Sequence, residues 1–306
     1  MRKIITLGIL VSGFMLSGCE NEVLPPVATC EPEGYTQTEL KQLRENSFKV
    51  DNDAARQTLA INLVKCLSDP NPEIRDGVAY EALATWMRGK KLNGETIRTL
   101  KQTLLEIVQS GKNTNGFEKP FAALVLAEIA RIDRISPFMS TYDRTAFVAA
   151  GAEYVTGIKD YRGFSDREGW RHNVAHGADW LMQLSLNPKI TKEDAIKIRD
   201  AVAAQIRADK KHAYIHGEPA RLAWPILFLS GRGLFTEAEW TAWLGDISAP
   251  APLSNWNAAF KTESGLAQRH NLKMFLNALY LNATLSESDA TRQLLAGTKA
   301  ALQKLP

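Results

Sequence analysis

The chain lacks most of the short motifs by which enzymes are recognised. It contains no GxSxG nucleophile elbow, no HExxH zinc-protease motif and no glycine-rich phosphate loop. Among its 306 residues there are only three cysteines and five histidines, and the formal net charge is only +3. Enzyme classes that depend on those motifs are therefore excluded. The small net charge gives no electrostatic footprint for nucleic acid, so no nucleic-acid partner is expected.

Long apolar runs are also missing, except at the N-terminus. Arg2 and Lys3 form a positive start, and the run IITLGILVSGFML that follows is too short for a comfortable membrane span. Such a segment is typical of an export signal. It ends in LSGC, Leu16–Cys19, which resembles the lipobox of bacterial lipoproteins. We therefore expect a signal peptide over residues 1–18 and lipidation of Cys19 by diacylglyceryl and palmitoyl groups, whose several acyl chains together anchor firmly.

The residues after Cys19 predict where the protein is held. Glu20 directly follows the lipobox cysteine. A residue other than aspartate at this position resembles the pattern of Gram-negative lipoproteins that are sent to the outer membrane. The resemblance implies an outer-membrane lipid anchor with the folded part facing the periplasm. Residues 19–36 carry three prolines and no helical periodicity, which indicates a flexible tether.

Two cysteines remain in the mature chain, Cys30 in the tether and Cys66 in a predicted helix. In an exported protein two such cysteines can form a disulfide. The bridge would close a loop of roughly 37 residues and contribute about 4 kcal/mol in the chain-entropy model. The sequence leaves open whether they approach closely enough.

From Thr38 onward the apolar residues follow helical spacing, and no stretch long enough for a sheet alternates apolar with polar residues. Asp53 is a candidate helix cap, and further helices are predicted to start near Asn93, Glu118, Thr141 and Thr191. The segment DPNPEIRDGVAYEALATWM is similar to the Asp-Pro turn and Arg-bearing helix of a HEAT-type repeat. We expect one all-α domain over residues 37–306, a HEAT-like α/α superhelix of stacked antiparallel helix pairs.

Two of the histidines stand four residues apart in GWRHNVAHGADW. On a helix, where each residue advances by about 100°, His172, His176 and Asp179 share one face. The apolar residues on the opposite side are Val174, Ala178 and Leu181. This pattern predicts that the polar stripe points away from the core.

A second pair with the same spacing occurs in HAYIHGEPARLAW. Pro219 is suited to the first turn of a helix, so His212 and His216 are expected on the preceding loop, and Glu218 is expected to pair with Arg221. No cofactor is predicted from this arrangement. The alternative is a zinc site, because imidazoles four apart with a nearby carboxylate can bind zinc; its candidate ligands are His172, His176, Asp179, His212 and His216.

Three segments carry a family resemblance: DYRGFSDREGWRHNVAHGADWLMQL, GEPARLAWPILFL and RHNLKMFLNALYL. They are similar to successive landmarks of the bacterial domain-of-unknown-function family 2785, and the similarity covers most of the mature chain. The resemblance implies a helical, HEAT-like fold and no particular reaction. The chain differs from the many cytoplasmic relatives by its export signal and lipobox, so their partners do not carry over.

These patterns lead to one functional expectation and one alternative. We expect a scaffold that binds a peptide, a protein or a cell-envelope ligand in a polar groove, with the membrane contacted through the lipid. The candidate ligand-binding residues are Arg162, Asp166, Trp170, His172, His176, Asp179, Glu218 and Arg221. The alternative is a metal-assisted or glycan-cleaving hydrolase in which the histidines serve as ligands or bases, with Asp166 or Asp179 as the acid–base group. Convergence of the two histidine units in a concave pocket would favour the enzyme.

Overall fold

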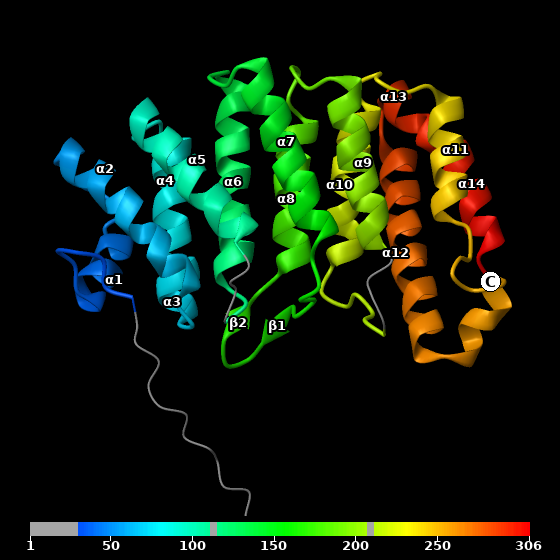
Figure 1. Ribbon diagram of the computed structural model, residues 1–306, viewed down its shortest axis with the longest axis horizontal. Helices are drawn as coiled ribbons and strands as arrows, with labels where there is room; N and C mark the ends of the chain where they lie inside the picture. The colour runs from blue at the N-terminus through cyan, green and yellow to red at the C-terminus, as the bar shows by residue number, and fades with distance from the viewer. Residues whose placement is uncertain (1–29, 111–114, 207–210) are drawn as a thin grey trace, which may run out of the picture.

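A computed structural model describes residues 30–110, 115–206 and 211–306 of the chain. The predicted signal peptide and the predicted lipidation site Cys19 lie outside these residues. The described part is all-α apart from one short hairpin, as the sequence predicts (Figure 1). None of its helices combines the length and the apolar character that a membrane-spanning segment requires.

The elements follow one another with short connections. The first part of the chain forms α1 (Gln37–Glu45), α2 (Asp53–Asn62), the 3₁₀ helix η1 (Leu63–Ser68), α3 (Pro72–Ile74), the π-helical η2 (Arg75–Tyr80), α4 (Glu81–Arg88), α5 (Gly94–Gln109), α6 (Glu118–Ile135) and α7 (Thr141–Thr156). The second part forms β1 (Phe164–Ser165), β2 (Gly169–Trp170), α8 (Asn173–Ser185), α9 (Lys192–Ile206), α10 (Glu218–Ser230), α11 (Glu237–Ile247), η3 (Trp256–Lys261), α12 (Glu263–Leu285), α13 (Asp289–Arg292) and α14 (Leu294–Lys304).

Side-chain caps explain where several helices begin. Asn93 accepts a hydrogen bond from the backbone N–H of Thr96 and starts α5 at the predicted place. The predicted cap of α2 is wrong by one residue, because Asn52 accepts from the N–H of Ala55 and Asp53 is the first helical residue. Both side chains satisfy N–H groups that the first helical turn leaves without an intrahelical partner.

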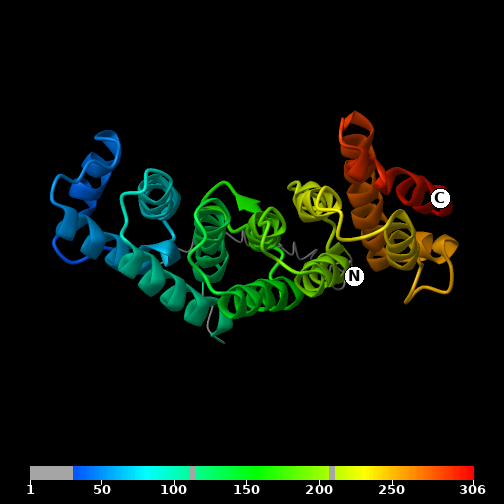
Figure 2. The same ribbon diagram turned by 90° about the horizontal axis from the view of Figure 1, so that it is seen from above.

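The helices stack in two rows. α6, α8, α10 and α12 pack side by side in one row, and α5, α7 and α9 form the second row behind them. Consecutive helices such as α7 and α8 pair across the rows, which is the arrangement of a HEAT-like superhelix. Figure 2 shows the stack as an arc whose two ends turn toward the same side.

Small residues let α8 pack closely against α7 of the second row. A Cβ on Gly177 would lie only 2.8 Å from Val155 of α7, so that only glycine permits this approach. The indole of Trp180 is fully buried, and its ring packs against Gly151 of α7. Most side chains of α8 are therefore buried, the polar ones included.

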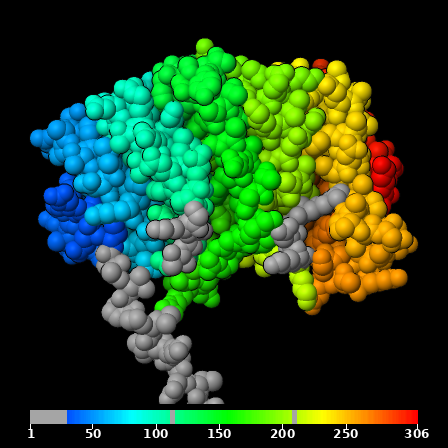
Figure 3. Space-filling model, viewed as in Figure 1, coloured from blue at the N-terminus to red at the C-terminus, as the bar shows by residue number. Residues whose placement is uncertain are grey.

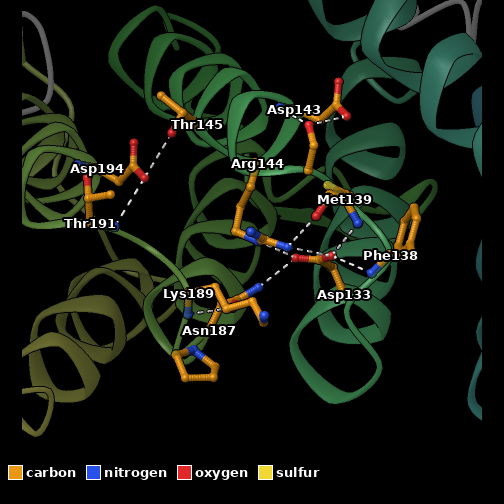
Figure 4. Close-up of polar contacts among 12 residues, drawn as sticks. Asp133, Phe138, Met139, Asp143, Arg144, Thr145, Asn187, Lys189, Thr191 and Asp194 are labelled. Carbon is orange, nitrogen blue, oxygen red and sulfur yellow. Dashed lines mark hydrogen bonds and ion pairs between the residues drawn. The ribbon is translucent and has the colours of Figure 1, made fainter.

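A buried carboxylate fixes the turns at one edge of the stack (Figure 4). Asp133 accepts hydrogen bonds from the backbone N–H groups of Phe138 and Met139, from the guanidinium of Arg144 and from the amide of Asn187. Burial opposes ionisation here, but these donors outweigh it and lower the pKa of Asp133. The ion pair links α6 and α7 to the turn that follows α8.

A disulfide joins Cys30 to Cys66, with the two Cα atoms 5.2 Å apart. Cys66 lies in the 3₁₀ helix η1, which replaces the continuous α-helix predicted from the sequence around it. The backbone N–H of Cys30 also donates to Asp69. The segment that leads into α1 is therefore held against the stack at residue 30.

Candidate functional site

The segments that carry the two histidine pairs lie at one edge of the stack. The β1–β2 hairpin and the stretch before α10 both extend past the lower edge in the orientation of Figure 1, and Figure 3 shows them as two projections there. Both project where α8 and α10 begin, since each segment leads directly into its helix. The two sequence motifs are thus brought to the same edge by parallel helices of one row.

Two arginines fix the hairpin onto α6 and η2. Arg75 is fully buried, donates to the carbonyl of Glu168 at 2.9 Å and lies over the ring of Phe117 at 4.1 Å. Arg171 covers the same ring at 4.2 Å and pairs with the Glu168 carboxylate at 3.0 Å. The two guanidinium groups stacked on the Phe117 ring thus fix the hairpin, and with it Trp170 at the end of the hairpin, beside the first histidine pair.

His172 does not lie within the helix, contrary to the prediction. It is the N-cap of α8 with a φ of 55°, a left-handed conformation that few non-glycine residues adopt. Its ring stacks on Trp170 with centroids 3.9 Å apart and planes nearly parallel. Residues held in such strained backbone conformations cluster at functional sites.

The outward orientation predicted for the stripe is wrong for His176 and Asp179. His176 is only 8% exposed, its Nδ1 lies 3.2 Å from the carbonyl oxygen of Pro120, and its ring meets the edge of Phe121 at 5.0 Å. Burial, with a smaller contribution from His172, lowers the pKa of His176 to about 3. With this pKa, His176 is neutral at pH 7. The prediction fails because α6, α7 and α10 enclose most of α8, so that the polar face of α8 contacts other helices and not solvent.

Arg221 pairs with Asp179 and not with Glu218 as predicted. Its guanidinium lies 2.6 Å from both Asp179 oxygens, joining α10 to α8. Burial outweighs this attraction and raises the pKa of Asp179. Glu218 is instead buried at the start of α10, where it accepts the backbone N–H of His216 at 2.8 Å.

The loop with the second histidine pair is held by α12. The Asn271 side chain accepts the N–H of Tyr214 at 2.8 Å and donates to the carbonyl of His212 at 3.0 Å. His270 lies 3.0 Å from the Tyr214 carbonyl. The segment RHNLKMFLNALYL therefore positions the loop, and His212 and His216 precede α10 as predicted.

The two histidine units meet at Trp170 rather than around one point. The ring of His216 stands edge-on to Trp170 at 5.8 Å, whereas His212 stacks on Tyr161 at 5.0 Å. Across the three described ranges, no three His, Cys, Asp or Glu side chains gather in a way that could hold a metal ion. The donors of the zinc alternative are thus not assembled into one ligand set, and Arg221 occupies the space beside Asp179.

Beside this ring cluster lies a groove of about 650 Å³. Four predicted residues line it: Trp170, His172, His176 and Arg221. The other wall was not predicted and is formed by Arg44, Pro72, Glu73, Asp76, Gly77, Tyr80, Glu81, Phe121 and Leu124. The groove therefore runs from α1 and η2 across α6 and α8 to α10.

Four predicted binding residues lie elsewhere. Asp179 and Glu218 are buried behind the surface, in the contacts given above. Arg162 is exposed and pairs with Asp160 at 2.6 Å, and Asp166 is exposed in the hairpin turn. Arg162 and Asp166 thus do not line the groove.

The two histidines that line the groove lie beside its aromatic rings and are neutral at pH 7. Burial, with smaller contributions from Arg221 and His216, lowers the pKa of His172 to about 4. Its Nδ1 is buried without a hydrogen-bond partner among the described residues. Such an atom is costly unless a ligand or water satisfies it.

Comparison with known proteins identifies a family without assigning an activity. The family model described as "Protein of unknown function (DUF2785)" matches residues 104–281, more than half of the chain. No curated protein and no solved structure matches the chain. The matched range includes α6, α8, α10 and most of α12, and hence most of one wall of the groove.

Proposed function

We propose that this chain, which belongs to the DUF2785 family of proteins of unknown function, is a lipid-anchored envelope protein that binds a polar ligand in its groove. The observation that carries this proposal is the buried Nδ1 of His172, which has no hydrogen-bond partner among the described residues and belongs to a residue lining an open groove. A ligand would supply the missing partner. Beside the His172 ring, Trp170 supplies an apolar aromatic surface, and aromatic side chains commonly line binding pockets.

The lipid anchor is proposed from the sequence. The Leu-Ser-Gly-Cys end of the apolar segment supports acylation of Cys19, and Glu20 supports transfer to the outer membrane with the stack in the periplasm. The disulfide between Cys30 and Cys66 fits an oxidising compartment such as this one. Fractionation of cells that produce the Cys19→Ser variant tests the anchor: the variant should leave the membrane fraction and lose labelled palmitate, and retention of both would contradict it.

Binding is tested with the full chain in detergent. The native protein and its Trp170→Ala variant are immobilised and incubated with solubilised cell-envelope material, and the bound compounds are identified by mass spectrometry. Trp224→Ala is a matched control, because Trp224 is 40% exposed and Trp170 36%, but Trp224 lies on another surface. We expect a compound that is retained by the native protein and the control and lost from Trp170→Ala. Equal retention by all three would contradict binding in the groove.

We do not propose the hydrolase alternative. A metal-assisted reaction needs several ligands around one ion, and no such group occurs within the described ranges. A glycan-cleaving reaction needs a pair of carboxyl groups flanking the bond. Of the two acids predicted for it, Asp166 lies outside the groove and Asp179 is held by Arg221.

A further inference from the structure

The proton on the ring of His176 can be assigned from its contacts. The carbonyl oxygen of Pro120 can only accept a hydrogen bond, and it lies 3.2 Å from Nδ1. Nδ1 therefore carries the hydrogen, and Nε2 of the neutral ring carries a lone pair. Since His176 lines the groove, Nε2 is the ring nitrogen left for a ligand, and it accepts from a donor. The side chain is more than nine-tenths buried, so this acceptor has a fixed position.

Three of the ionised groups along the groove already have partners of opposite sign. Asp76 accepts from Arg75 at 2.7 Å, and Arg221 is held by Asp179 at 2.6 Å. Glu73 pairs in the same way with Lys41 at 2.7 Å. A charged ligand would compete with these pairs, whereas an uncharged ligand leaves them in place.

Of the other lining residues, Arg44 and Glu81 carry opposite charges. The groove as a whole thus has no strong net charge that would select an ion. Its polar atoms are of both kinds: Nε2 of His176 and the carboxylate of Asp76 accept hydrogen bonds, and the guanidinium of Arg44 donates them. A hydroxyl group can both donate and accept, and it can turn its hydrogen toward whichever partner it meets, whereas the N–H and C=O groups of a peptide backbone have fixed directions.

We infer that the ligand of the groove is an uncharged sugar chain, an assignment that rests on the proposed binding function. The C–H face of one sugar ring packs against the exposed part of Trp170, as apolar faces pack on aromatic side chains. A hydroxyl group of the same ring donates to Nε2 of His176. A second hydroxyl satisfies Nδ1 of His172.

The test measures binding of an uncharged probe to the full chain in detergent. A tetrasaccharide of N-acetylglucosamine is titrated by calorimetry into the native protein and two variants. His176→Asn keeps an amide N–H close to Nδ1 for the Pro120 carbonyl but removes Nε2, so the fold retains its hydrogen bond. His176→Gln places an amide group near Nε2 and should recover part of the binding. Trp224→Ala is again the control.

We expect the tetrasaccharide to bind the native protein and the control equally, with affinity reduced at least tenfold in His176→Asn and partly restored in His176→Gln. Equal affinity in all four proteins would overturn the assignment of Nε2.

A blocked hexapeptide of alternating alanine and serine is titrated in parallel. If the peptide binds in a His176-dependent way and the sugar does not, the sugar assignment is wrong and the binding function stands. If neither probe binds, the sugar inference is overturned, and the retention experiment above decides separately whether the groove binds anything.

Discussion

Replacing His176 with asparagine should make the fold less sensitive to acid. Burial holds the pKa of His176 at about 3, whereas an unfolded chain has a histidine pKa of about 6.5. The unfolded state therefore takes up this proton first as the pH falls below 6.5, and the folded state loses stability until the pH reaches 3. Between pH 7 and pH 5 the loss from this one ring is about 2 kcal/mol, an upper value because it takes the full shift.

The assay is urea unfolding of the native chain and of His176→Asn at pH 7, 6 and 5, followed by circular dichroism. Contributions of the other titrating groups are common to both proteins and cancel in the difference. We expect the free energy of unfolding to fall by about 2 kcal/mol less in the variant over this range. His176→Gln serves as a second variant that also lacks the titrating ring. Parallel pH curves for all three proteins would refute the assignment of a buried neutral ring at this position.

Three further outcomes follow from other contacts. Asp133→Ala leaves a buried guanidinium without its counter-ion and should lower the free energy of unfolding by about 3 to 5 kcal/mol in urea, whereas a change below about 1 kcal/mol would contradict the role given to this ion pair. Joint replacement of Cys30 and Cys66 by serine should cost about 4 kcal/mol in the same assay, and no loss would mean that the bridge does not constrain the unfolded chain. A Cβ at Gly163 would collide with the ring of His216, so Gly163→Ala should shift the His216 ring signals in NMR spectra, and unchanged signals would place that ring elsewhere.

The sequence was sufficient to predict the fold because helical periodicity and caps act locally. Asn93 caps its own helix, and Pro219 lies in the first turn of α10 with the second histidine pair on the loop before it. Each of these features depends on residues within one turn of the chain. Stacking then follows from the need of each amphipathic helix to bury its apolar face.

The site could be predicted only in part because its contacts are distant in sequence. Arg221 forms its ion pair with Asp179, 42 residues away, and not with the neighbouring Glu218. Nothing in the local spacing of residues predicts this pairing. Because the backbone of His172 is left-handed, α8 begins only at Asn173. The His172 ring therefore does not lie on the helical face that the predicted stripe assumes. The wall around Asp76 comes from a π-helical segment, whose wider turns do not follow the α-helical period, so the α-helical pattern did not mark it as part of a groove.

The measurement that tests the groove most directly is an NMR titration of the full chain labelled in its histidine rings. Solubilised cell-envelope material is added, and the ring signals are followed. The rings of His172 and His176 line the groove, whereas the ring of His270 packs near the loop before α10, outside it. We predict that the signals of His172 and His176 shift and that those of His270 do not. Unmoved groove histidines, or a shift confined to His270, would contradict a ligand site in this groove.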